Sequence, residues 1–138
     1  MLRKLLAVFV IMLTAVSFAL AGSKPNVKEG KWQVTTRMEM PGMQMSMPPM
    51  THTQCITQDD YVPQTSQPGQ DCEITKTRIS GDTVTWTMHC RSPEGEMKGN
   101  GTVTYRGDSF EGKISMSMPQ AGMEMTIYTS GRRIGDCE

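Results

Sequence analysis

The chain has 138 residues, and its 14 lysine and arginine residues balance 14 aspartate and glutamate residues, which gives a formal net charge of zero at pH 7. The charged residues are scattered singly, so the sequence offers no basic surface that would attract nucleic acid or anionic membrane. The length is enough for one compact domain.

The first 21 residues have the pattern of a secretory signal peptide. Arg3 and Lys4 precede an apolar run over residues 5–20, and Ala19 and Ala21 frame a small-residue cleavage site. We therefore predict a signal peptide over residues 1–21 and a single β domain over residues 22–138, periplasmic or secreted. No later apolar run is long enough for a membrane-spanning helix, so no transmembrane segment is expected in the mature chain.

The mature chain begins its regular structure with a predicted hairpin. Apolar and polar residues alternate over residues 32–40, which predicts a half-buried strand. A Pro-Gly turn follows, and methionines alternate with polar residues over 43–47, which predicts a returning strand. Because Pro48 and Pro49 cannot donate to a central ladder, this strand should bend there or lie at a sheet edge before resuming over 51–57.

Five more strands follow a polar loop that lies between Cys55 and Cys72. Alternation predicts them over residues 73–79, 83–90, 97–105, 110–118 and 123–127. Gly99, Gly101 and Gly112 fall on the apolar faces of their strands, where they would relieve crowding or permit sharp curvature.

Seven strands and no helix longer than a turn predict an all-β fold, an antiparallel meander. Each strand has one consistently apolar face, which fits an up-and-down barrel or a strongly curled half-barrel. A two-sheet β-sandwich is the alternative.

An even number of cysteines in an exported chain favours two disulfides. The four residues are Cys55, Cys72, Cys90 and Cys137, and their spacing contains no C-x-x-C metal motif. Four cysteines allow three connectivities. We favour a bond between Cys55 and Cys72, which would close the polar loop, together with a bond between Cys90 and Cys137.

Several short motifs are distributed over the mature chain. They are Gly30-Lys31-Trp32, Met40-Pro41-Gly42-Met43, Met47-Pro48-Pro49-Met50 before Cys55, Gly81-Asp82-Thr83-Val84-Thr85-Trp86 before Cys90, and Gly131-Arg132-Arg133-Ile134-Gly135-Asp136-Cys137. In this order they resemble the exported bacterial proteins of domain of unknown function family 3617. The resemblance supports the domain boundaries and the compartment, and it implies no established activity. Gly30 and Trp32, with Arg132 or Arg133, are also similar to a lipocalin-type motif, which favours a barrel.

Methionine dominates the apolar inventory, because residues 22–138 contain twelve methionines and no leucine. Methionine is a flexible gap-filler, so many of these residues should belong to the core. If one end of the barrel is not filled, they would line a pocket for an apolar small molecule or an envelope component. The candidate ligand-binding residues are Met38, Met40, Met45, Met47, Met116, Met118, Met123 and Met125.

Two other functions use the same side chains. Thioethers are soft ligands that suit Cu(I), so a periplasmic copper site is an alternative reading of the region from Met40 to Met50. Its candidate ligands are Met40, Met43, Met45, Met47, Met50 and His52. The third hypothesis is a structural module whose methionine hairpin docks an envelope protein.

Catalysis has little support in the sequence. The two histidines, His52 and His89, have no acidic neighbour in the chain, and no serine lies in a nucleophile elbow. Asp59 and Asp60 are more easily explained as a turn cap than as a general acid and base. We therefore expect a non-enzymatic binding protein that needs no cofactor, unless the copper hypothesis holds.

Overall fold

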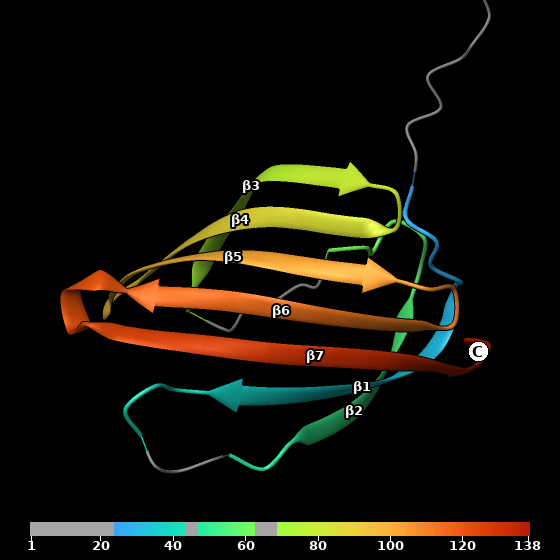
Figure 1. The fold of residues 1–138 in the computed structure, drawn as a ribbon, viewed down its shortest axis with the longest axis horizontal. Coiled ribbons are helices and arrows are strands. Elements are labelled where there is room, and N and C mark those ends of the chain that lie inside the picture. Colours follow the sequence, from blue (N-terminus) through green and yellow to red (C-terminus); the bar gives the residue numbers. More distant parts are fainter. Residues whose placement is uncertain (1–23, 44–46, 63–68) are drawn as a thin grey trace, which may run out of the picture.

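A computed structural model describes residues 24–43, 47–62 and 69–138, and the predicted signal peptide lies outside them. The described residues form an all-β structure (Figure 1). Its strands are β1 (Gly30–Glu39), β2 (Met50–Ile56), β3 (Asp71–Ser80), β4 (Thr83–Ser92), β5 (Gly95–Tyr105), β6 (Ser109–Met118) and β7 (Met123–Gly135). A single 3-10 turn, η1 (Pro119–Ala121), joins β6 to β7. Among the described residues, no helix is long and apolar enough to cross a membrane.

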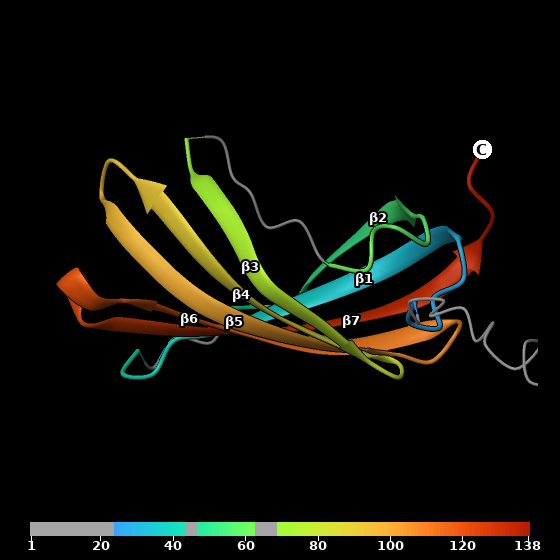
Figure 2. The ribbon, with the colours of Figure 1, turned by 90° about the horizontal axis from the view of Figure 1, so that it is seen from above.

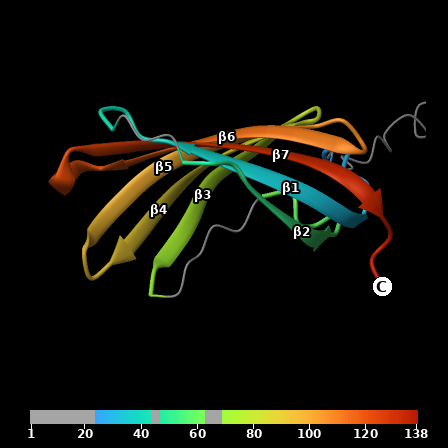
Figure 3. The ribbon, with the colours of Figure 1, turned by 90° about the horizontal axis from the view of Figure 1, so that it is seen from below.

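All seven strands belong to one antiparallel sheet, in the order β2-β1-β7-β6-β5-β4-β3. The predicted antiparallel all-β class and number of strands are therefore confirmed, and the single sheet is not a sandwich. Figures 2 and 3 show that the sheet curls into an open trough, with β2 and β3 at its two edges. The structure is thus the half-barrel form of the predicted architecture.

The two edges of the trough have the same strand direction. Each of the six neighbouring pairs is antiparallel, so the two edge strands β2 and β3 must run in the same direction. Residues 57–70 connect β2 to β3. We call residues 57–70 the linker, and of these the structure describes 57–62 and 69–70.

The concave side of the trough, which we call the inner face, carries the core. In β4 the inward residues Val84, Trp86, Met88 and Cys90 are all buried, and the residues between them are not. The predicted alternation is therefore confirmed. The buried hydrophobic residues are Val27, Trp32, Val34, Ile56, Val84, Trp86, Met88, Cys90, Val103, Tyr105, Phe110 and Ile114. Phe110 joins the aromatic part of this core, with its ring centroid 5.5 Å from that of Trp32 and 5.6 Å from that of Tyr105.

The predicted strand over residues 43–47 is wrong at its described ends. Met43 lies in a turn, where its N–H donates to the carbonyl of Met40 at 3.3 Å, and Met47 lies outside any strand. Residues 44–46 lie outside the described part of the chain. Pairing begins only at Met50, opposite Thr36, because the two prolines before Met50 have no N–H to donate.

The favoured disulfide connectivity is also wrong. The structure joins Cys72 to Cys90, with Cα atoms 4.0 Å apart, and Cys55 to Cys137, with Cα atoms 6.0 Å apart. Cys72 and Cys90 lie directly opposite each other in the register of β3 and β4. Lys31 of β1 pairs with Cys55 on one side and with Gly135 on the other, which brings the end of β7 within reach of β2. Strand register decided the pairing, whereas the prediction followed proximity in sequence.

Candidate ligand groove

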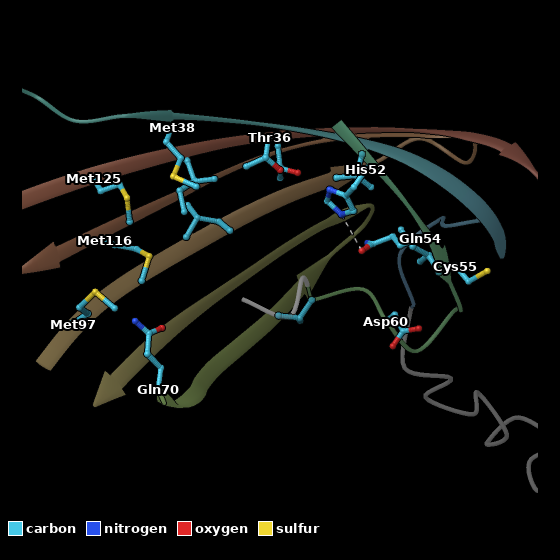
Figure 4. Close-up of a pocket in the computed structure, with 16 residues that line it drawn as sticks. Thr36, Met38, His52, Gln54, Cys55, Asp60, Gln70, Met97, Met116 and Met125 are labelled. Atoms are coloured by element: carbon cyan, nitrogen blue, oxygen red, sulfur yellow. Dashed lines mark hydrogen bonds between the residues drawn. The ribbon is translucent and has the colours of Figure 1, made fainter. Parts of the chain in front are cut away.

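The trough contains a groove of about 660 Å³ that the core side chains do not fill. Its volume lies in the range of about 300–1,000 Å³ that is common for small-molecule sites. Figure 4 shows its side chains projecting from the strands into the hollow. The lining residues are Val34, Thr36, Met38, His52, Gln54, Cys55, Ile56, Asp60, Val62, Gln70, Met97, Ile114, Met116, Met125, Ile127 and Thr129.

One end of the groove, which we call the apolar end, is rich in thioethers, and Gln70 is a polar side chain beside them (Figure 4). Met116 and Met125 lie opposite each other in the register of β6 and β7, and Met97 reaches the same end from β5 (Figure 4). Met38 of β1 lies opposite Ile127. All these side chains are only partly buried, so their flexible thioethers can adjust to the shape of an apolar guest.

The other end of the groove is polar. His52 and Gln54 project inward from the edge strand β2, and the Nε2 of His52 lies 3.3 Å from the Oε1 of Gln54 (Figure 4). Asp60 approaches from the linker, and its carboxylate accepts hydrogen bonds from the Oγ1 of Thr57 at 2.8 Å and from the Thr57 N–H at 3.1 Å. Both hydrogen bonds lower the pKa of Asp60 below its usual range, and the bond from the Thr57 hydroxyl has the larger effect. Asp60 therefore carries a negative charge at neutral pH.

A buried tyrosine holds the linker against the inner face. The hydroxyl of Tyr105 donates to the carbonyl of Tyr61 at 2.7 Å, which fixes the described start of the linker beside the groove. Burial, with a smaller contribution from the negative charge of Asp60, raises the pKa of Tyr105 well above its usual value. Tyr105 was placed on an apolar face by the sequence pattern, but its role as an anchor depends on a contact 44 residues away that the pattern does not contain.

Comparison with known proteins gives one match. The family model described as "Protein of unknown function (DUF3617)" matches residues 27–137, which is most of the chain. The chain belongs to the DUF3617 family. No curated protein and no solved structure matches it. The resemblance inferred from the sequence motifs is thus confirmed.

The groove of this DUF3617 protein contains part of the predicted ligand-binding set. Met38, Met116 and Met125 line it, whereas Met40, Met47, Met118 and Met123 do not, and Met45 lies outside the described residues. The prediction omitted Met97, although the alternation in its strand already placed Met97 on the apolar face. It also omitted the polar end, because residues from β2 and the linker meet there only through the tertiary fold.

Of the predicted copper ligands that the structure describes, Met40, Met43 and Met47 lie in the loop between β1 and β2, and Met50 and His52 lie in β2. Met43, Met47 and Met50 are 58%, 49% and 65% exposed, and of the predicted set only His52 lines the groove. Met40 is partly buried in the same loop, and Met45 lies outside the described residues. In the described part of the chain, no three or more His, Cys, Asp or Glu side chains gather closely enough to hold a metal ion.

Proposed function

We propose that this protein is a non-enzymatic binding protein that holds an apolar small molecule in its inner groove. The observation that carries the proposal is the groove itself, an unfilled space of about 660 Å³ whose apolar end is lined by partly buried methionine side chains. Each CH₂ group that leaves water contributes about 0.8 kcal/mol. A ligand with a hydrocarbon chain would therefore gain enough to offset the cost of association.

We further propose that it acts in the periplasm or in another oxidising compartment outside the cytoplasm. The support is the presence of two disulfides, which persist in exported proteins and are rare in the cytosol. The signal-peptide pattern in residues 1–21 points the same way. An envelope location would bring the groove close to lipids and other sparingly soluble molecules.

Titration with Nile red, an uncharged dye that fluoresces in apolar surroundings, tests the groove. Met125→Gln places a polar amide at the apolar end and should weaken binding roughly tenfold, because it removes apolar surface and adds a polar group that must be desolvated. Met123→Gln is the matched control, since Met123 lies two residues away on the same strand, is 47% exposed and does not line the groove. Equal losses in both variants, or no dye binding by the parent protein, would contradict the proposal.

Cu(I) binding in the loop between β1 and β2, together with Met50 at the start of β2, is the second candidate function. It is favoured by the exposure of Met43, Met47 and Met50, because packing in the core does not account for these side chains. Anaerobic Cu(I) titration against a competing chelator should show stoichiometric binding that is lost when all three are changed to leucine. Leucine keeps the apolar character and removes the sulfur. Binding that survives the substitution, or no competition by the parent protein, would exclude these residues as copper ligands.

The third candidate, docking of an envelope protein, uses the same exposed methionines. It predicts the opposite response to the leucine substitutions, because an apolar contact surface would be preserved. Crosslinking of a partner that persists in the leucine variant and disappears with glutamine at the same positions would favour docking over copper.

A further inference from the structure

The two ends of the groove differ in polarity, and this difference narrows the class of ligand that can fit it. Met97, Met116 and Met125 line the apolar end, with Gln70 beside them, whereas His52, Gln54 and Asp60 surround the other end (Figure 4). A ligand that fits both ends must itself have an apolar part and a polar part.

The charge of the polar end determines which polar part is accepted. Among the described lining residues there is no lysine or arginine, and Asp60 provides a carboxylate. The nearby Lys24 is already paired with Asp59 at 2.8 Å. An anionic head group would therefore meet a like charge without a counter-charge from the lining. An imidazole, a carboxamide and a carboxylate can together donate to and accept from an uncharged hydroxyl-bearing group.

We propose that the groove binds single-chain amphiphiles with an uncharged, hydroxyl-bearing head and discriminates against fatty-acid anions. The hydrocarbon tail lies along Met97, Met116 and Met125, and the head group contacts His52, Gln54 and Asp60. This inference rests on the proposed function, because it specifies the ligand class of the same groove.

Displacement of Nile red by two amphiphiles with the same twelve-carbon tail tests the inference. The uncharged probe is 1-monododecanoylglycerol and the anionic probe is dodecanoate, both used below their aggregation concentrations at about pH 8. The monoester should displace the dye at a roughly tenfold lower concentration than the carboxylate, because juxtaposed like charges are strongly disfavoured.

A charge variant with a matched control tests whether the discrimination against dodecanoate arises at the polar end of the groove. Gln54→Lys adds a cation to the polar end and should raise the affinity for dodecanoate relative to that for the monoester several-fold. Thr53→Lys adds the same charge one residue away on β2, where the side chain points to the outer face, and should change neither affinity. Asp60→Asn is an independent second variant: it removes the negative charge, keeps an oxygen that can accept the Thr57 hydrogen bonds, and should also strengthen dodecanoate binding.

The outcomes separate the inference from the proposed function. If the dye binds and dodecanoate displaces it as well as the monoester does, the head-group selectivity is overturned and the apolar groove stands. The inference is likewise overturned if neither probe displaces bound dye, or if Thr53→Lys and Gln54→Lys have the same effect. If the parent protein does not bind the dye at all, the proposed function fails first.

Discussion

Single residues on the inner face determine how closely the strands and their aromatic side chains can pack. Gly101 lies opposite Trp86 in the register of β4 and β5, and a Cβ atom at Gly101 would fall on the indole ring. A Cβ atom at Gly112 would come within 2.6 Å of the Cγ2 of Val103. The sequence placed both glycines on the apolar face but could not show which side chains fill the space that they leave.

Gly101→Ala should lower the free energy of unfolding by about 1–3 kcal/mol, because the added methyl group forces the Trp86 ring out of its packed position. Denaturant unfolding measures the change. Gly135→Ala is the control, since its Cβ would meet nothing within 4 Å and its effect should stay within about 0.5 kcal/mol. Equal destabilisation by both substitutions would show that close packing under Trp86 is not the cause.

Tyr105 gives the fold a dependence on alkaline pH. Its pKa is raised in the folded state, so folding favours the protonated phenol: the stabilisation is complete below the ordinary value of 10.0 and is lost as the pH rises above it. Between this value and the folded-state pKa, the free energy of unfolding should fall by up to about 1.4 kcal/mol per pH unit. Tyr105→Phe should remove this part of the slope and, at neutral pH, cost about 0.5–1.5 kcal/mol through the lost bond to Tyr61. Unfolding curves of both proteins from neutral to alkaline pH test this. The same alkaline slope in parent and variant would rule out Tyr105 as its source.

At the scale of strands, local patterns predicted the fold better than they predicted its contacts. Alternation predicted the strands and their apolar faces except at β2, because a period of two is a local property of each strand. In β2 the predicted start over residues 43–47 is wrong, and the inner face carries the polar His52 and Gln54. The pairing of β1 with β7, the disulfides and the polar end of the groove depend on register between segments that are distant in sequence. Among the described members of the predicted ligand set, Met38, Met116 and Met125 line the groove and the others do not, because alternation identifies a face and does not show which part of that face remains unfilled.

The two disulfides constrain very different lengths of chain. Cys72 and Cys90 are 18 residues apart, whereas Cys55 and Cys137 are 82 residues apart. In the loop-entropy model these separations correspond to about 3 and about 4.5 kcal/mol of stabilisation. Paired substitutions to alanine should therefore destabilise the protein more at the long-range bond, and peptide mapping should recover the two bonds in this connectivity.

The two disulfides should also differ in their effect on ligand binding. The bond from Cys55 holds β2, which carries the polar end of the groove, so its removal should weaken Nile red binding at a temperature where the variant remains folded. The bond between Cys72 and Cys90 lies in β3 and β4, neither of which lines the groove among the described residues. Loss of binding only when the latter bond is removed would contradict the location of the site.

At the scale of the whole molecule, the two edges of the open trough contribute unequally to the lining of the groove. The edge strand β2 and the linker line the groove, whereas β3 and β4 contribute no lining residue in the described chain. The hairpin of β3 and β4 is fixed by its own disulfide, and β2 is tied through Cys137 to the end of β7. A ligand in the groove would thus connect the linker and β2 with β1, β5, β6 and β7, and among the described residues it would approach the opposite edge at Gln70, which precedes β3.

Hydrogen exchange measured with and without 1-monododecanoylglycerol should show this asymmetry. At a free ligand concentration of 100 times Kd, binding adds about 2.7 kcal/mol to the free energy of unfolding, which slows exchange that requires global opening throughout the sheet. Exchange by local opening should slow in β2 and at residues 57–62, where the ligand adds contacts, and remain unchanged in β3, which serves as an internal control. Slowing of local exchange at β3 but not at β2 would place the ligand on the other side of the trough and refute the groove as its site.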